Sequence, residues 1–226
     1  MLDPNPATDP HSMPDPRPMP DPRVAHFDRL FGQSEDPWNY RGSAYERAKY
    51  DATLAALPQA RFASVIEVGC ANGELAARLA DRADRYLGLD CAARAVELAR
   101  RRLYRHAQAR VRQCFVPRHW PRRRADLIVL SEVVYYLTPE EIGALCERVD
   151  DSLLPGGAVV IVCWTGATGT KLSGREALQL TVSGLVAKGR YRCGAPRRAT
   201  GYDLALLSKT EPRTEPHDRR SEAGAR

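Results

Sequence analysis

The sequence lacks a hydrophobic run long enough to cross a membrane. Its most apolar stretch, Ala158 to Trp164, is far shorter than the roughly 20 residues that a membrane-spanning helix needs. The amino terminus has no positive patch followed by an apolar run, which is the pattern of a secretory signal. We therefore predict a cytoplasmic protein without a membrane partner.

Cysteine pairs are absent as well. The six cysteines are scattered without a CxxC pair: Cys70, Cys91, Cys114, Cys146, Cys163 and Cys193. This spacing excludes a zinc knuckle and a disulfide framework. We expect small buried hydrophobic side chains in a reducing compartment, and we predict no metal site.

Acidic residues are in the minority, with 28 Asp and Glu against 34 Lys and Arg and a net charge of +6. A basic balance can attract nucleic acid. However, the arginine runs 100–102 and 122–124 have no interleaved aromatic residues, so a solvated surface is favoured over a nucleic-acid groove. We predict no nucleic-acid partner.

The chain of 226 residues is 43% hydrophobic, enough for one buried core. Residues 1–22 contain eight prolines and four Asp-Pro pairs, a composition that cannot bury apolar surface. The stretch from Thr210 is polar and charged. We predict a disordered leader over 1–22, a single domain over 23–209 and a disordered tail over 210–226.

Short apolar strands alternate with helical segments along this domain. The strands are expected at 63–68, 85–89, 109–115, 125–130 and 158–163. This alternation predicts an α/β fold with a doubly wound, mostly parallel, seven-stranded sheet and helices on both faces. Two weaker strands near 188–193 and 202–207 are joined by a short helix-free linker, so they should pair antiparallel.

Three helices are expected to begin with a capping box, in which a Ser or Thr and a Glu three residues later bond each other's backbone N–H groups. The pairs are Ser43 with Glu46, Thr138 with Glu141 and Ser173 with Glu176. An amphipathic segment from Val24 to Phe31 precedes the first of these helices, and Leu153 to Gly157 is expected to be a turn.

The first strand ends in Glu67, and the glycine-containing segment Gly69-Cys70-Ala71-Asn72-Gly73 leads into a helix. Ligands of open α/β sheets bind at the carboxyl ends of the strands, where glycines let the backbone approach them closely. We predict a nucleoside site formed by Glu67, Gly69, Cys70, Ala71 and Gly73. A dinucleotide fingerprint would need glycine at positions 71 and 74, so NAD is only the runner-up cofactor.

The second strand ends at Asp90, whose carboxylate can accept hydrogen bonds from both ribose hydroxyls of adenosine. Cys91 follows it, and Gln113 and Cys114 lie where contacts with adenine would be made, although packing explains them equally well. Taken singly, the glycines could only form a turn and Asp90 could only cap a helix. Their order at consecutive strand ends favours a nucleoside ligand.

The fourth strand delivers Ser131, Glu132, Tyr135 and Tyr136 to the same edge. We assign Ser131 to the cofactor and the other three to catalysis, because a carboxylate and hydroxyls can position a nucleophile and stabilise changing charge. The alternative is that Glu132 caps the next turn and the tyrosines are core aromatics.

Two tryptophans, Trp38 and Trp164, are expected on the ligand side. Each could hold a cationic substrate over its ring or simply anchor the packing of its loop. We assign both to substrate binding.

Together these segments resemble the class I S-adenosylmethionine-dependent methyltransferases. The resemblance is carried by residues 67–73, Asp90, residues 126–132 and Pro155-Gly156-Gly157. Within that superfamily the chain resembles the nodulation protein S (NodS-like) family over roughly residues 24–165. That narrower resemblance is carried by His26-Phe27-Asp28, Asp36-Pro37-Trp38, Tyr45-Glu46-Arg47 and residues 132–137.

The resemblance implies a Rossmann-like fold, S-adenosyl-L-methionine as cofactor, and N-methylation of the free amine of an amino sugar or a deacetylated chitooligosaccharide. A small-molecule O-methyltransferase and a non-catalytic nucleoside-binding protein stay open as alternatives. A nucleic-acid base methyltransferase is disfavoured, because Ser131-Glu132-Val133-Val134 stands where those enzymes carry an Asn/Asp-Pro-Pro-aromatic segment.

Replacing Asp90 with alanine should weaken the binding of S-adenosyl-L-homocysteine. The substitution leaves the ribose hydroxyls of the ligand without a buried partner, which costs about 1–3 kcal/mol. Titration calorimetry of the wild-type and Asp90→Ala proteins measures this difference. An unchanged affinity would remove Asp90 from the site.

Overall fold

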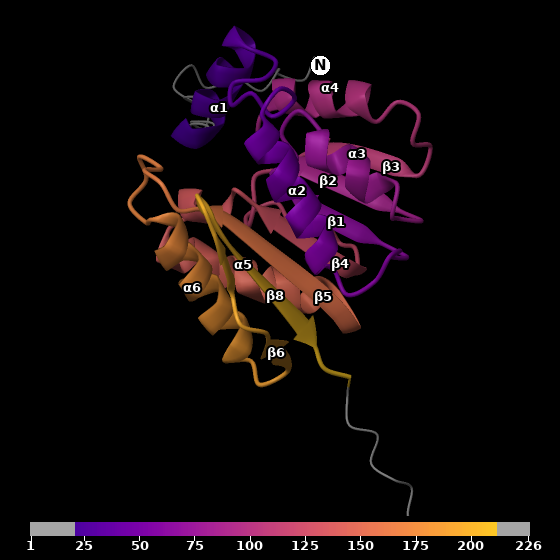
Figure 1. The fold of residues 1–226 in the computed structure, drawn as a ribbon, viewed down its shortest axis with the longest axis vertical. Helices are drawn as coiled ribbons and strands as arrows, with labels where there is room; N and C mark the ends of the chain where they lie inside the picture. Colours follow the sequence, from indigo (N-terminus) through magenta and orange to yellow (C-terminus); the bar gives the residue numbers. More distant parts are fainter. Residues whose placement is uncertain (1–20, 212–226) are drawn as a thin grey trace, which may run out of the picture.

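A computed structural model describes residues 21–211 of the chain (Figure 1). In chain order the elements are α1 (Pro22–Gln33), α2 (Ala44–Ala56), β1 (Val65–Val68), α3 (Glu74–Ala80), β2 (Tyr86–Asp90), α4 (Ala93–Arg102), β3 (Ala109–Gln113), β4 (Ala125–Ser131), the 3-10 helix η1 (Val134–Tyr136), α5 (Pro139–Ser152), β5 (Leu153–Trp164), α6 (Gly174–Val186), β6 (Tyr191–Cys193), β7 (Arg197–Ala199) and β8 (Tyr202–Lys209).

The predicted ends of the domain differ slightly from those of the described region. Asp21 and Pro22 were expected to belong to the leader, but Pro22 begins α1 and the Asp21 carboxylate accepts a hydrogen bond from the backbone N–H of Arg23. Residues 1–20 and 212–226 lie outside the described residues, so the predictions for most of the leader and the tail are untested.

The strands form one sheet in the order β3-β2-β1-β4-β5-β8-β6, with β7 paired to β8. The neighbours from β3 to β5 are parallel, whereas β8 is antiparallel to both β5 and β6. This arrangement confirms the α/β fold and the antiparallel carboxyl-terminal pair. The sheet has eight strands instead of seven, because residues 197–199 of the linker fold back on β8.

The predicted turn from Leu153 to Gly157 is wrong, because these residues already belong to β5. Leu153 pairs with Ala125, and Ala158 pairs with Leu127, so β5 takes more residues than β4 over this interval. The extra residues form an irregularity that includes Gly156 at a φ of 75°. A glycine at positive φ lets the strand bend without ending.

Helices cover both faces of the sheet (Figure 1). Alternate residues of β1 point to opposite faces, so Ile66 packs in the cluster that includes residues of α5 and α6, and Val65 packs in the cluster that includes residues of α2, α3 and α4. The strand order reverses between β1 and β4. In doubly wound sheets ligands bind at such a reversal, beside the carboxyl ends of the strands.

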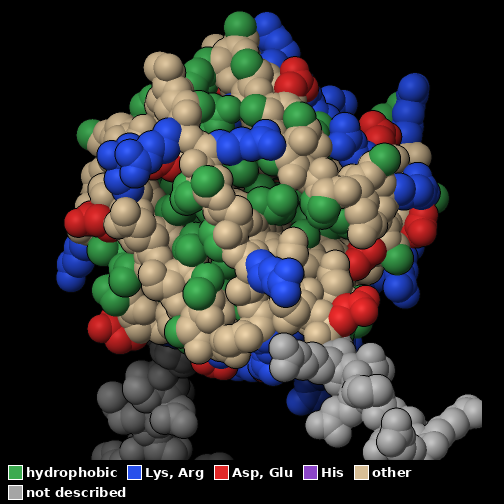
Figure 2. Space-filling model, turned by 60° about the horizontal axis from the view of Figure 1, so that its bottom comes forward, with side chains coloured by type: hydrophobic (Ala, Val, Ile, Leu, Met, Phe, Trp, Pro, Cys, Tyr) green, Lys and Arg blue, Asp and Glu red, His purple; other side chains and the backbone are tan. Residues whose placement is uncertain are grey.

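On the face shown in Figure 2, the charged side chains do not gather in one patch. Hydrophobic side chains lie toward the middle of this face, and Lys, Arg, Asp and Glu form small separate groups around them. Within residues 21–211, no helix combines the length and apolarity that a membrane crossing requires.

The six cysteines are free thiols in the structure. Cys70, Cys146 and Cys163 are buried, as expected for small hydrophobic side chains, whereas Cys91, Cys114 and Cys193 are only partly buried. Cys91 and Cys114 are exposed to a cavity described below.

The buried carboxylate of Asp150 in α5 forms an ion pair with Lys209 at the end of β8. Its side chain is 2% exposed, and it pairs with Arg190, with Tyr191 at 3.0 Å and with Lys209 at 3.1 Å. Burial raises the pKa of this carboxyl, but the hydrogen bonds from Arg190, Lys209 and Tyr191 outweigh burial and hold the pKa at about 2. The folded protein therefore stabilises the ionised form of Asp150 more than the unfolded chain does.

Replacing Asp150 with asparagine should lower the free energy of unfolding at pH 7 by about 2 kcal/mol, since the pKa lies almost two units below that of an unfolded aspartate. Because the folded pKa is depressed, this contribution is complete above pH 4 and disappears as the pH falls toward 2. Urea denaturation of both proteins across this range tests the prediction. The exposed neighbour Asp151 provides the control, since Asp151→Asn should change stability little at any pH.

Candidate functional site

A cavity of about 460 Å³ opens at the carboxyl ends of the parallel strands, where the strand order reverses. Its walls come from α1, the loop after it, α2, the turn after β1 and the ends of β2, β4 and β5. The predicted residues that line it are Trp38, Glu67, Gly69, Cys70, Ala71, Asp90, Cys91, Cys114, Ser131, Glu132, Tyr135, Tyr136 and Trp164. The structure thus brings most of the predicted site residues to one cavity of a volume typical of small-molecule sites.

The turn after β1 has an unusual backbone that places it against the cavity. Gly69 has a φ of 79°, Ala71 of 48° and Gly73 of 90°. A Cβ at Gly69 would lie 3.3 Å from Val133 Cβ, so this position requires glycine for space as well as for conformation. The backbone of the turn is thereby exposed to whatever occupies the cavity.

Two of the predicted residues do not line the cavity. A Cβ at Gly73 would lie 3.0 Å from Ala99 Cα and 3.1 Å from Arg102 Cβ, so this glycine lets α3 and α4 approach each other. Gln113 is exposed, and its amide donates to the Cys91 carbonyl at 3.0 Å. Gly73 thus acts through helix packing, and Gln113 acts through its hydrogen bond to the backbone of Cys91, which lines the cavity.

Asp90 lies at the end of β2 and is buried. Its carboxylate accepts hydrogen bonds from the backbone N–H of Ala71 at 2.9 Å and of Ala92 at 3.0 Å. The alternative interpretation of Asp90 as the cap of the next helix is not confirmed, because Ala92 is the N-cap residue of α4 and no side chain caps this helix; Asp90 instead holds the backbone just before the helix. The same carboxylate also faces the cavity, so these backbone contacts are compatible with the ribose interpretation.

Glu67, at the end of β1, is 1% exposed and accepts a hydrogen bond from the Tyr86 hydroxyl. Burial raises the pKa of this carboxyl to about 8, while the bond from Tyr86 lowers it and the nearby Asp90 raises it. Burial therefore favours the protonated form of Glu67 at neutral pH. A cationic group bound beside it would favour its ionised form.

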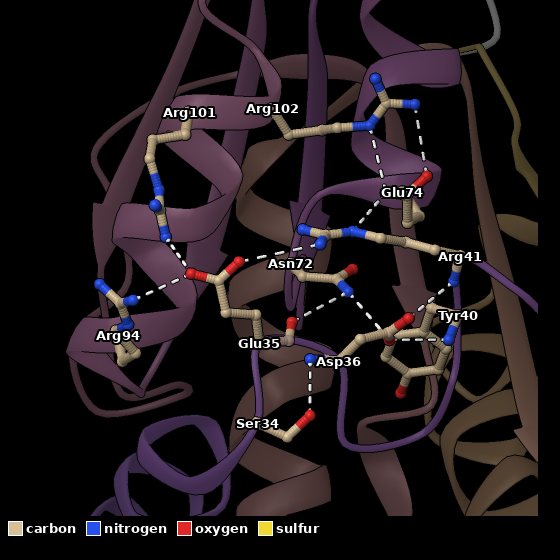
Figure 3. A network of polar contacts seen from close by, with 10 residues as sticks. All are labelled: Ser34, Glu35, Asp36, Tyr40, Arg41, Asn72, Glu74, Arg94, Arg101 and Arg102. Carbon is tan, nitrogen blue, oxygen red and sulfur yellow. Dashed lines mark hydrogen bonds and ion pairs between the residues drawn. The ribbon is translucent and has the colours of Figure 1, made fainter.

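The loop after α1 is tied to the glycine turn by polar contacts (Figure 3). The Asn72 amide donates to the Glu35 carbonyl at 3.3 Å and to the Asp36 carboxylate at 3.0 Å. Glu35 in turn pairs with Arg94 at 3.0 Å and Arg101 at 2.7 Å, both on α4. The Asn72 Oδ1 atom is buried and has no partner within the described residues.

Aromatic side chains from this loop and from α1 form the outer wall of the cavity. Trp38 stacks on Tyr40 and meets Phe31 edge to face, with 5.5 Å between ring centroids in each pair. Phe27 of α1 meets Tyr136 edge to face at 4.9 Å. Trp38 remains 38% exposed, so it both anchors the loop and presents a ring to the opening.

Trp164 stands at the opposite rim and is 36% exposed. Its indole meets the ring of Tyr45 edge to face at 5.7 Å. A Cβ at Gly166 would lie 2.4 Å from Trp164 Nε1, and one at Gly201 would lie 2.7 Å from Trp164 Cζ3. The two glycines therefore leave just enough room for the indole and restrict its orientation.

Glu132 adopts a φ of 55°, which is rare for a residue with a side chain. Its carboxylate accepts three hydrogen bonds: from Lys49 Nζ at 2.7 Å, from the Tyr135 hydroxyl at 2.8 Å and from the backbone N–H of Trp164 at 2.8 Å. The Glu132 carboxylate is therefore fixed in place by groups from α2, η1 and the end of β5.

The partner of Glu132, Lys49, was missed by the sequence analysis. Its side chain is 3% exposed and lies 3.0 Å from the carboxylate of Glu46 as well as 2.7 Å from that of Glu132. A signal was present in the sequence, because Glu46, Lys49 and Thr53 occupy the same face of α2 as the buried Tyr50 and Leu54. Charged residues at helical spacing on an apolar face indicate a buried ion pair.

The family profile of nodulation protein S (NodS) matches residues 29–161 of this chain. Nodulation protein S of Rhizobium tropici is 32% identical over 129 residues, which cover 56% of this chain and 54% of that protein. The protein from Bradyrhizobium diazoefficiens is 31% identical over 147 residues, which cover 61% of this chain and 70% of that protein. The match thus spans about half the length of the Rhizobium tropici relative.

Solved structures share the fold. A Pseudomonas syringae protein assigned as a methyltransferase is 35% identical with a TM-score of 0.64, covering 74% of this chain and 100% of that one. The N-methyltransferase NodS of Bradyrhizobium japonicum WM9, in complex with S-adenosyl-L-homocysteine, is 21% identical with a TM-score of 0.74, covering 84% of this chain and 100% of that one. The predicted methyltransferase fold is confirmed.

Replacing Lys49 with methionine should lower the free energy of unfolding by about 3 kcal/mol at pH 8, because Glu46 and Glu132 would face each other without a buried cation. Burial already raises the pKa of Glu46, and Lys49 is the main group that lowers it. A carboxyl with a raised folded pKa penalises folding above its unfolded pKa, so the loss should shrink as the pH falls toward 5.

Chemical denaturation of the wild-type and Lys49→Met proteins at pH 5 and pH 8 tests this prediction. Combining Lys49→Met with Glu46→Gln should recover part of the stability at pH 8, since one of the two facing charges is then removed. A loss of equal size at both pH values, without recovery in the double variant, would point to packing of the lysine stem instead of charge.

Proposed function

The chain belongs to the nodulation protein S (NodS) family, and on that basis we propose that it is a cytoplasmic methyltransferase that transfers a methyl group from S-adenosyl-L-methionine to an amine of a small polar acceptor, such as an amino sugar or a deacetylated chitooligosaccharide. The observation that carries the proposal is that the family match coincides with the cavity: the glycine turn, Asp90 and Glu132 all lie within residues 29–161 and face the same space.

The residues at the carboxyl ends of β1 and β2 are suited to the adenosyl donor. Asp90 is a buried carboxylate facing the cavity, as a ribose ligand requires, and the Gly69 backbone has no Cβ between it and the cavity. The unpartnered Asn72 Oδ1 is a buried acceptor that a donor group of the ligand can satisfy. We assign these residues, with Cys70, Ala71, Cys91, Cys114 and Ser131, to binding of the donor.

Glu67 is a buried carboxyl on this side of the cavity. Burial raises its pKa to about 8, and a positive charge bound beside it would favour loss of the proton and the ionised form. The donor carries a sulfonium and an ammonium, and it supplies the methyl group when it is bound.

The part of the cavity lined by the Lys49 ion pairs and the two tryptophans is suited to a cationic or sugar-like acceptor. Glu46, Lys49 and Glu132 together carry one net negative charge when ionised, and Trp38 and Trp164 present partly exposed rings at the rim. Aromatic faces hold cations and apolar ring surfaces. We assign Trp38 and Trp164 to the acceptor, and Glu132, Tyr135 and Tyr136 to the wall against which it is oriented.

The protein's contribution to the reaction is mainly positional. Displacement of a methyl group from a sulfonium needs alignment of the nucleophile more than covalent assistance. Three hydrogen bonds to Glu132 and the packing of Tyr135 against Tyr136, with 4.7 Å between ring centroids, hold this wall of the cavity in place. The aromatic cover from α1 and its loop limits the access of water.

Two measurements test the proposal. Wild-type protein should bind S-adenosyl-L-homocysteine in calorimetry, and it should transfer labelled methyl groups from the donor to glucosamine oligomers more readily than to simple phenols. Binding without transfer to either class would favour the non-catalytic alternative. Turnover of phenols without turnover of amines would favour the O-methyltransferase alternative, and absence of binding would refute the donor assignment.

A further inference from the structure

One capping box of the three differs from the other two. In α5 and α6 the box is complete, because Glu141 accepts from the Thr138 backbone N–H and Glu176 accepts from the Ser173 backbone N–H. In α2 only half of the box forms. Ser43 Oγ accepts from the Glu46 N–H at 3.2 Å, but the Glu46 carboxylate does not return the bond.

The Glu46 side chain turns into the cavity instead. The Ser43 backbone N–H donates to the Asn39 carbonyl at 2.9 Å, so the helix end does not need the Glu46 carboxylate. That carboxylate lies beside Lys49, and Glu46 is only 9% exposed although it lines the cavity. A glutamate held in a buried position loses solvation, and buried carboxylates of this kind are frequent at functional sites.

The two carboxylates that pair with Lys49 differ in how firmly they are held. Glu132 accepts hydrogen bonds from Lys49, Tyr135 and the Trp164 backbone. Among the described residues, Glu46 accepts one hydrogen bond, from Lys49 Nζ to Oε1 at 3.1 Å, and its buried Oε2 lies 3.0 Å from the same Nζ as an ion pair without hydrogen-bond geometry. A new donor entering the cavity therefore competes with fewer existing hydrogen bonds at Glu46 than at Glu132.

We propose that Glu46, and not Glu132, is the carboxylate that binds the ammonium of the acceptor and takes its proton, while Glu132 stays a fixed counter-charge for Lys49. This inference rests on the proposed N-methyltransferase function. Its basis is the position of the Glu46 carboxylate: it lines the cavity, it does not bond the Ser43 backbone N–H, and its Oε2 accepts no hydrogen bond within the described residues although it lies 3.0 Å from Lys49 Nζ.

An N–H bond of the acceptor ammonium breaks and an O–H bond forms on Glu46, which leaves a neutral amine with a lone pair. That lone pair forms the new N–C bond to the methyl group while the S–C bond breaks, and its electron pair stays on sulfur. The resulting secondary ammonium later loses a proton to solvent, and the proton on Glu46 leaves by the same route.

The surroundings of Glu46 favour this role. Burial raises the pKa of its carboxyl, and Glu132 raises it further, against the lowering effect of Lys49 and Tyr50. A proton acceptor is most effective when its pKa lies nearer the working pH. The other titratable groups that line the cavity are Arg23, Tyr40, Tyr45, Glu67, Cys70, Glu74, Asp90, Cys91, Cys114, Tyr135 and Tyr136.

The first test measures binding alone, with protein saturated by S-adenosyl-L-homocysteine. Calorimetry compares a glucosamine tetramer, which carries ammonium groups, with its fully N-acetylated form. Wild-type protein should bind the amine form at least tenfold more tightly at pH 7. Glu46→Gln should lose this preference, and Glu176→Gln should keep it, because Glu176 completes a capping box on α6 outside the cavity.

The second test measures methyl transfer to the glucosamine tetramer between pH 6 and pH 9. Glu46→Gln should lower kcat at least a hundredfold at pH 7, with partial recovery at high pH, where the free amine is supplied by solvent. Glu46→Asp, which keeps a carboxylate, should restore part of the rate. The affinity of each variant for S-adenosyl-L-homocysteine shows whether its site is intact.

The outcomes separate the two proposals. If wild-type protein does not bind S-adenosyl-L-homocysteine or transfers no methyl group, the proposed function fails. If it methylates the amine while Glu46→Gln keeps the wild-type rate, pH profile and amine preference, only the role of Glu46 is overturned. A wild-type protein without preference for the amine form over the acetylated form also overturns that role.

Discussion

The buried ion pair of Lys49 with Glu46 and Glu132 is the interaction on which the site depends. It joins α2, an element that precedes the sheet, to the backbone that leaves β4 at the centre of the sheet. A lysine that is 3% exposed is tolerated only because two carboxylates compensate its desolvation. Lys49 in turn fixes the Glu132 carboxylate, which also accepts hydrogen bonds from the Tyr135 hydroxyl and from the backbone N–H at the end of β5.

The rest of the cavity is arranged around that constraint. On the β1 and β2 side, backbone groups and the buried carboxylates of Glu67 and Asp90 face the space where we assign the donor. On the other side, aromatic rings and the Lys49 cluster face the space where we assign the acceptor. The loop after α1 closes the outer edge, held to the glycine turn by Asn72 and to α4 by Glu35 (Figure 3).

Local patterns predicted the fold well because they reflect short-range physics. The alternation of apolar strands and helices predicted the parallel sheet, and the acid, the glycines and Asp90 at successive strand ends predicted where the cavity lies. The irregular strand segment from Leu153 to Gly157 was wrongly predicted as a turn. A proline and two glycines in a row are typical of a turn, and only the pairing of Leu153 with the neighbouring strand shows that the segment belongs to β5. Spacing likewise could not distinguish a glycine that faces the cavity from Gly73, which serves helix packing.

The sequence by itself therefore determined the fold class, the edge of the sheet that holds the site and the family to which the chain belongs. Tertiary structure alone decided which polar groups are buried together. Ser43 and Glu46 have the same spacing as the two complete capping boxes, yet a bond from Ser43 to Asn39 and the presence of Lys49 turn Glu46 inward. Such a choice depends on contacts between segments far apart in the chain, such as Lys49 with Glu132, and no local pattern encodes them.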